Sequence, residues 1–324
     1  MSSFQSLSTK DVSDGTATIF GLEQSFLKKE KFFSKAQGVL LFIHGFNSSA
    51  EIWGNQSEGF VSSAIKKKYI PFVIDFSDSF NGSIVNLADQ DLFFLFEFVR
   101  TFLKDHFTSQ QLPIHFVAHS MGGIILRYFL SFNHKHTNHT AEDLKKSNLK
   151  SAALLGVPNH GISKSNSDNL VSKMEKFIMD FNALAGKKYT LKLANKAFFQ
   201  LLSGNSIIDS LLENLSSNMW PELFWMNFIG NRDIVVDKNS SFFPTEEVEY
   251  LQSNFYQMDF DATHMRNPFH SFTNALVKKI PFTDSKFFSR IEKKTPDFLS
   301  FLTKDPIYAN TSLIEDYFSR ITAL

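Results

Sequence analysis

A serine lies in a turn of small residues between two apolar runs. Residues 118–123 read AHSMGG, and they follow the apolar run 114–117 and precede the apolar run 124–130. This pattern predicts a short strand, a sharp turn and a helix, because Ala118 and Gly122 leave space where the chain reverses direction. Such a turn raises the serine hydroxyl above the backbone and directs the N-terminus of the helix toward it. The alternative is an ordinary strand-turn-helix with a surface serine.

The rest of the chain alternates short apolar runs with amphipathic stretches. Apolar residues recur at three- and four-residue steps over 86–107, which predicts a helix. Short, continuous apolar runs are typical of parallel strands that are buried on both faces. Strands alternating with helices predict the α/β class, with a mainly parallel sheet that helices cover on both sides. The expected strands are 39–43, 69–75, 114–117, 150–156, 223–229 and 254–258.

Length and pattern together predict a single core with an insertion. The chain has 324 residues, which is compatible with one large α/β domain or two ordinary ones. Residues 162–219 read as helices without a strand, so we expect a helical cap, or lid, between two strands of the sheet. The alternative is that these helices only complete the core. The expected organisation is a lead-in at 1–37 with one edge strand or helix, a core at 38–161 and 220–280, the cap, and a helical tail at 281–324.

The composition excludes several kinds of chemistry. The chain has no cysteine, which rules out disulfides, thiol nucleophiles and cysteine-ligated metals. Its formal net charge is zero, so we do not expect nucleic acid as a main ligand. Apolar runs stay far below the roughly 20 residues that a membrane span needs. The polar first 21 residues lack the apolar core of a signal peptide, and we therefore expect a cytoplasmic protein.

Ser120 needs partners elsewhere in the chain, because a serine hydroxyl is a weak nucleophile until a base takes its proton and an acid orients that base. We expect the acid in a turn after a late strand and the base in a loop after the final strand. Asp233 and His264 occupy these places and complete the expected order of serine, acid and histidine. Asp237 is the alternative acid. His270, in the helical stretch that follows, is the alternative base.

Two backbone N–H groups are expected to bind the oxyanion of such a reaction. One belongs to Met121, which directly follows the serine at the start of a helix. The other belongs to Phe46, in the loop after the first apolar strand, where Gly45 lets the backbone approach a substrate closely. His44 and His119 flank the site, and we expect them to pack or to form structural hydrogen bonds.

Three segments together resemble the α/β-hydrolase superfamily. They are His44-Gly45-Phe46, the AHSMGG turn at 118–123, and the GVPNHG segment at 156–161. More narrowly, the chain resembles the lipase-like branch that includes small bacterial triacylglycerol lipases and GPI inositol-deacylase-like proteins. The resemblance covers about 39–280.

The match departs from the family pattern at three positions. Ala118 stands where the general motif has its first glycine. The third segment is similar to the Gly-Thr-Pro-His-x-Gly pattern of that branch, but Val157 occupies the threonine position and His160 is displaced by one. These departures leave the substrate open, while the fold that the resemblance implies does not depend on them.

The resemblance implies a serine hydrolase that cleaves carboxylic esters through an acyl-enzyme, without a metal or an organic cofactor. It implies a small-molecule ester as substrate. The 38 phenylalanines are spread along the whole chain, which favours a role in the core in place of Leu and Ile. The alternative is an apolar surface for a lipid substrate or for peripheral contact with a membrane. Alternatives are thioesterase, acyltransferase or amidase activity of the same triad, or a non-catalytic protein that binds lipids or a partner. For His134, His136 and His139, a solvated loop is favoured over a zinc site, because no carboxylate or cysteine completes a ligand set.

Overall fold

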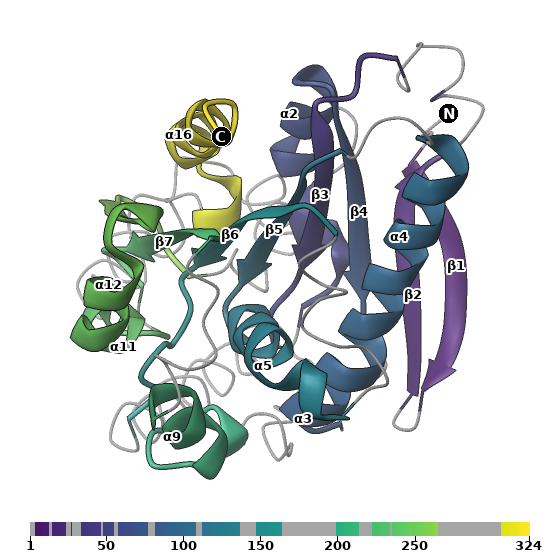
Figure 1. Ribbon diagram of the computed structural model, residues 1–324. Helices are drawn as coiled ribbons and strands as arrows, with labels where there is room; N and C mark the ends of the chain where they lie inside the picture. Colours follow the sequence, from purple (N-terminus) through teal and green to yellow (C-terminus); the bar gives the residue numbers. More distant parts are fainter. Residues whose placement is uncertain are drawn as a thin grey trace, which may run out of the picture.

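One sheet of eight strands runs through the described part of the chain (Figure 1). The structure is a computed structural model that describes residues 4–12, 15–23, 27, 34–46, 48–54, 58–76, 82–107, 112–136, 147–163, 199–213, 222–233, 235–264 and 306–324. The strands are β1 (Phe4–Val12), β2 (Gly15–Leu22), β3 (Gly38–Ile43), β4 (Tyr69–Asp75), β5 (Ile114–His119), β6 (Leu149–Leu155), β7 (Phe224–Gly230) and β8 (Phe255–Phe260). Their spatial order is β1-β2-β4-β3-β5-β6-β7-β8. Strands β3 to β8 are parallel, β2 is antiparallel to β4, and β1 is antiparallel to β2.

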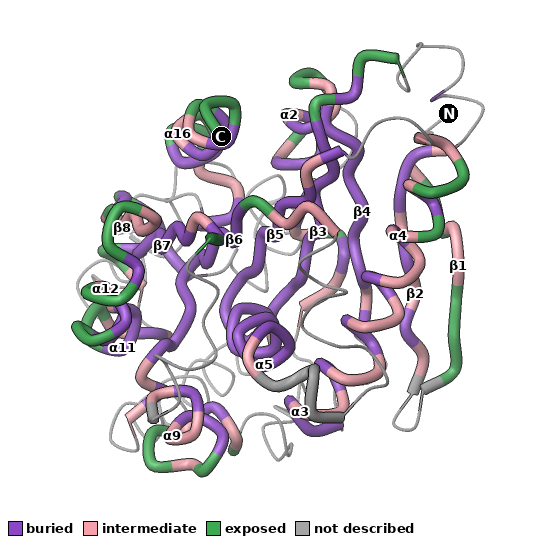
Figure 2. Tube along the Cα trace, in the orientation of Figure 1, coloured by how far each residue is buried: buried purple, intermediate pink, exposed green. Residues whose placement is uncertain are grey.

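Helices cover the sheet on both faces, which is why its central strands are continuous apolar runs. Every residue of β3 and β5 is buried, and Figure 2 shows this buried centre between more exposed helices. One face packs against α3 (Ile84–Asn86), a π-helical segment (Leu87–Leu92), α4 (Phe93–His106), α5 (Met121–His136) and α9 (Ser206–Glu213). The other face packs against a 3₁₀ turn (Ala50–Trp53), α2 (Gly59–Lys66), a second 3₁₀ turn (Ile307–Ala309) and α16 (Thr311–Ile321). This arrangement confirms the predicted α/β class.

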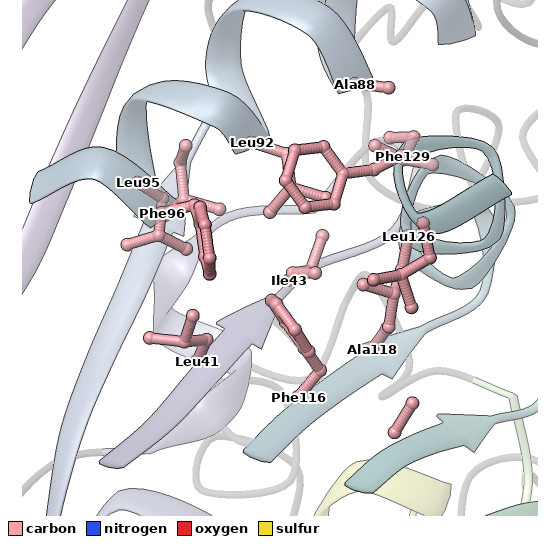
Figure 3. Packing of buried hydrophobic residues seen from close by; sticks show 14 of the residues in the cluster. Leu41, Ile43, Ala88, Leu92, Leu95, Phe96, Phe116, Ala118, Leu126 and Phe129 are labelled. Atoms are coloured by element: carbon pink, nitrogen blue, oxygen red, sulfur yellow. The ribbon is translucent and has the colours of Figure 1, made fainter. Parts of the chain in front are cut away.

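Side chains on β5 alternate between these two cores. Phe116 and Ala118 point to the core that contains α4 and α5, while Val117 belongs to the core on the opposite face. In the first core the ring of Phe96 lies 6.5 Å from that of Phe116 and 5.8 Å from that of Phe129. Figure 3 shows these three side chains among their apolar neighbours. Phenylalanine thus fills the interior of the described part, where it supplies most of the largest fully buried side chains.

The lead-in contributes two strands to the sheet instead of the single edge strand or helix that we expected. In β2, Ala17 and Ile19 are fully buried while Thr16 and Thr18 are partly exposed, which is the alternation of a half-buried strand. No residue of β1 (Phe4–Val12) for which burial is described is buried. An outer strand of this kind carries almost no apolar signal, and its polar sequence concealed it.

Much of the predicted cap and tail lies outside the described residues. Within 162–219 the structure describes Ile162, which bridges to Leu202, and α9, which packs against α5. Of the tail it describes residues 306–324, which include α16. The division into core, cap and tail therefore stays a prediction. Across the described segments, no helix is both long enough and apolar enough to cross a bilayer.

The remaining described helices lie between β7 and β8 in the chain, and these two strands are at one edge of the sheet. Each is short, and α11 contacts β7 (Figure 1). They are α11 (Lys238–Ser241), α12 (Thr245–Leu251) and a 3₁₀ turn (Gln252–Asn254).

Candidate active site

The carboxyl ends of three parallel strands carry the residues predicted for the site. Ser120 directly follows β5, while Asp233 and His264 lie in the loops that follow β7 and β8. In an open α/β sheet, the carboxyl ends of the strands form the edge where ligands bind. The fold therefore brings these three residues to one edge, although they are distant in the sequence.

Ser120 occupies a tight turn between β5 and α5. Its φ angle is +53°, in the left-handed region that non-glycine residues rarely adopt and that costs free energy. Its N–H donates to the carbonyl oxygen of Leu155 at 3.0 Å. A Cβ on Gly122 would lie 2.5 Å from the carbonyl oxygen of His44 and 2.6 Å from that of Ile43. The turn thus has the sharp geometry expected from its small residues.

His264 lies between Ser120 and Asp233 and contacts both. Its Nε2 is 2.7 Å from Oγ of Ser120, and its Nδ1 is 2.6 Å from Oδ2 of Asp233. Because an ionised carboxylate only accepts hydrogen bonds, the network assigns the proton to Nδ1 and leaves Nε2 to accept from the serine hydroxyl. The side chains of His264 and Asp233 are only 2% and 1% exposed. The three groups form a buried, continuous hydrogen-bonded chain.

The second oxygen of the Asp233 carboxylate is also bonded. Its Oδ1 accepts hydrogen bonds from the backbone N–H groups of Val235, at 2.9 Å, and Val236, at 2.8 Å. Two backbone donors on one oxygen hold the carboxylate in one orientation. The turn after β7 therefore fixes the group that orients the imidazole of His264.

Asp237, the alternative acid, has a different role in the structure. It is the N-cap of α11, where its Oδ1 accepts from the N–H of Ser240 at 3.0 Å and its Oδ2 accepts from that residue's hydroxyl at 2.9 Å. Capping of this kind stabilises the start of a helix. His270, the alternative base, lies outside the described residues.

One predicted oxyanion donor directly follows the serine, and the other follows the glycine that approaches it. Met121 is fully buried and begins α5, so its N–H is among the four at a helix start that have no acceptor within the helix. Phe46 follows Gly45 in the loop after β3. A Cβ on Gly45 would lie only 2.7 Å from Cβ of Ser120, which shows how closely this loop approaches the serine. Glycine is needed here for that approach.

The two flanking histidines form hydrogen bonds to the backbone, as expected. His44 Nε2 accepts from the N–H of Phe76 at 3.1 Å, and its Nδ1 lies 2.9 Å from the carbonyl oxygen of Gly45. His119 Nε2 lies 2.8 Å from the carbonyl oxygen of His264. Burial lowers the pKa of His119 well below 6.5, and the neighbouring His264 lowers it further. His119 is therefore a neutral donor.

The GVPNHG segment passes directly beside the site. Gly156 has a φ of +57°, and a Cβ there would lie 3.2 Å from both Oδ2 of Asp233 and Nδ1 of His264. A side chain at this position would both strain the backbone and press on the contact between these two residues. Gly156 therefore forms part of the wall of the site.

A buried polar network anchors that segment, and sequence reasoning missed it. Arg127 on α5 pairs with Glu247 on α12, and both side chains are almost fully buried. Arg127 also donates to Oδ1 of Asn159 at 2.9 Å, and Nδ2 of Asn159 donates to the carbonyl oxygen of Ser241 at 2.8 Å. Burial raises the pKa of Glu247 to about 7 and lowers the pKa of Arg127. The available signal was one charged residue inside the apolar run 124–130.

The histidines considered for zinc lie outside the described side chains. The structure describes only the backbone of 134 and 136, and 139 lies beyond α5. Among the described residues, no group of three or more histidine, aspartate or glutamate side chains is placed to hold a metal ion. The preference for a solvated loop over a zinc site at these histidines thus stays a prediction.

Comparison with known proteins identifies the fold. No protein-family model and no curated protein sequence matches the chain. Among solved structures, a soluble variant of monoglyceride lipase from Saccharomyces cerevisiae has a TM-score of 0.51 at 13% identity, over 86% of this chain and 94% of that one. The esterase Pf2001 of Pyrococcus furiosus has a TM-score of 0.49 at 17% identity, over 89% and 91% of the two chains. With its strand order and connections, the chain has the α/β-hydrolase fold.

Proposed function

We propose that this α/β-hydrolase-fold protein is a serine hydrolase that cleaves carboxylic esters through an acyl-enzyme. The observation that carries the proposal is the buried chain of hydrogen bonds from Ser120 through His264 to Asp233. It supplies a nucleophile, a base and an acid that orients the base, which are the parts that acyl transfer by serine requires. The left-handed turn at Ser120 supports the same role, because backbone strain of this kind concentrates at functional sites.

In the first half of the reaction, Oγ of Ser120 attacks the carbonyl carbon of the ester while His264 Nε2 takes the hydroxyl proton. The carbonyl oxygen becomes an oxyanion, which the N–H groups of Met121 and Phe46 stabilise. Asp233 holds the imidazole in the required tautomer and stabilises the imidazolium. His264 then gives its proton to the leaving alkoxide oxygen. An alcohol departs, and the acyl group remains bonded to Ser120.

In the second half, water replaces the alcohol. The water oxygen attacks the acyl carbon while His264 takes a proton from the water. The same two N–H groups stabilise the second oxyanion. The bond to Oγ of Ser120 breaks, and His264 returns the proton to this oxygen. The products are one carboxylic acid and one alcohol for each ester and water consumed, and the enzyme is restored.

We propose small-molecule carboxylic esters as the substrates. Support comes from the contacts of Ser120 and Asp233 with His264, since a serine hydroxyl paired with an imidazole base is suited to taking the acyl group of an ester. If residues 162–219 form a lid over this edge of the sheet, longer apolar acyl chains are the better substrates. A lipid ester and transient contact with a membrane surface both belong to this part of the proposal.

A series of p-nitrophenyl esters from acetate to palmitate tests the proposal. The wild type is expected to hydrolyse at least part of the series, and Ser120→Ala should lose turnover by roughly 10⁴-fold or more. Ser319→Ala, which changes an exposed serine on α16, is the matched control and should keep wild-type rates. Hydrolysis that persists in a folded Ser120→Ala protein would contradict the assignment. If the protein hydrolyses thioesters or amides but no ester, then thioesters or amides replace carboxylic esters as the proposed substrates.

A further inference from the structure

We infer that His119 is a positioning residue that sets the place of His264, by donating a hydrogen bond from its Nε2–H to the backbone carbonyl oxygen of His264. The inference rests on the proposed function, because it concerns the base of that reaction. The Nε2 atom of His119 and the carbonyl oxygen of His264 are 2.8 Å apart. The bond joins the residue immediately before the nucleophile to the residue that carries the base, across 145 positions of sequence.

His119 reaches His264 because of its position in β5. Successive side chains of a strand point to opposite faces, and Phe116 and Ala118 point to the core that contains α5. His119 therefore points to the opposite face, where the 3₁₀ turn Ile307–Ala309 lies. There the centre of its ring lies 5.0 Å from that of Tyr308, in a T-shaped arrangement, and 4.8 Å from that of His264.

The protonation of His119 is fixed by its surroundings. A carbonyl oxygen only accepts, so Nε2 of His119 must carry the hydrogen. The residue is 2% exposed, and burial with the nearby His264 lowers its pKa well below 6.5. His119 consequently stays neutral, and it neither competes with His264 for the proton nor repels the imidazolium that forms during the reaction.

The hydrogen bond supplies a restraint that the imidazole contacts alone do not. The backbone before His264 is already held, because the carbonyl oxygen of Thr263 accepts from the N–H of Ile307 at 2.7 Å. His119 fixes the next carbonyl group, that of His264 itself. The base is thus held in place relative to β5, the strand that ends at His119. Such positioning matters for catalysis, since a displacement of about 1 Å at a reacting group can cost roughly 10²-fold in rate.

Two substitutions separate the hydrogen bond from the packing of the ring. His119→Gln can place an amide nitrogen near the position of Nε2 and keep a donor. His119→Phe keeps a ring of similar shape but has no donor. The matched control is His115→Phe, because His115 lies on the same face of β5, is equally buried, and contacts Ser151 Oγ at 2.8 Å instead of the site. Thermal unfolding establishes that each variant is folded.

The first measurement is steady-state hydrolysis. His119→Phe is expected to lower kcat by roughly 10- to 100-fold with KM changed much less. His119→Gln should recover most of this loss, and His115→Phe should keep the wild-type kcat even if it unfolds at a lower temperature. A folded His119→Phe protein with the wild-type kcat would overturn the inference. Equal losses in the Gln and Phe variants of His119, or an equal loss in His115→Phe, would do the same.

The second measurement does not depend on turnover. The proton between His264 Nδ1 and Asp233 should give a low-field NMR signal in the wild type and in His119→Gln, because the hydrogen bond is short and buried. In His119→Phe this signal should broaden or vanish. An unchanged signal in His119→Phe overturns the inference. Wild-type protein that shows the signal but has no Ser120-dependent hydrolysis contradicts the proposed function instead.

Discussion

Gly123 and Val157 touch so closely that no side chain fits between them. A Cβ on Gly123 would lie 2.1 Å from Cγ2 of Val157, so α5 and the loop after β6 are in direct contact. That helix begins next to Ser120, and that loop begins at Gly156 beside Asp233 and His264. The contact therefore fixes the distance between the element that carries the nucleophile and the wall of the site.

Gly123→Ala should destabilise the fold by roughly 1–3 kcal/mol, because an overpacked interior forces neighbouring atoms to move. Alanine favours a helix over glycine by about 1 kcal/mol, so a loss of stability would be steric in origin. Removing two methyl groups in the double variant Gly123→Ala, Val157→Ala should restore part of the loss. Urea unfolding of both single variants and the double variant measures the coupling. If the changes in unfolding free energy of the two single variants simply add in the double variant, the contact between residues 123 and 157 does not determine the loss of stability.

Asp233→Asn should lower kcat by roughly 10³- to 10⁴-fold, because an amide does not hold the imidazole of His264 in the required tautomer. Asp237→Asn is the matched control, because asparagine caps a helix about as well as aspartate and Asp237 caps α11. Steady-state kinetics of both variants decide between the two acids. If Asp237→Asn lowers kcat more than Asp233→Asn does, the acid that orients His264 is Asp237 instead of Asp233.

Much of this fold follows from local patterns in the sequence, and part of it does not. Buried strands such as β3 and β5 are continuous apolar runs, so their positions could be predicted from single segments. The strand β1 escaped prediction because its outward-facing residues are polar, and the pairing partner that makes it a strand lies elsewhere in the chain. Pairing of this kind is a property of tertiary structure.

The same contrast holds within the site. Ser120, Asp233 and His264 could be selected from one motif and a chain order, since each follows a recognisable strand. The pairing of Arg127 with Glu247 spans 120 positions of sequence, and Glu247 stands in a stretch, TEEVEY, that reads as an exposed helix. Nothing local distinguishes a buried glutamate from its exposed neighbours.

Glu247 should make stability depend on pH. Burial raises its pKa from 4.5 to about 7, against the opposing effect of Arg127. Between these values the folded protein holds a proton that the unfolded chain has released. The stabilisation from this group is therefore complete below about pH 4.5 and is lost as the pH rises through 7.

The comparison with Glu247→Gln isolates this effect, because glutamine has no proton to lose. From pH 5 to pH 8, the free energy of unfolding of the wild type should fall relative to that of Glu247→Gln by roughly 1–3 kcal/mol. Urea unfolding of both proteins at several pH values gives the difference directly. A difference that stays constant, or that grows with pH, would show that the carboxyl is ionised throughout.

Covalent labelling tests most directly whether Ser120 is an activated nucleophile. The full chain is treated with a fluorophosphonate, its intact mass is measured, and the modified peptide is sequenced. We expect a single adduct on Ser120, none on Ser120→Ala, and slower labelling of Asp233→Asn, since the base that activates the serine has lost its partner. No adduct on a folded wild-type protein, or an equal adduct on Ser120→Ala, would contradict this role of Ser120.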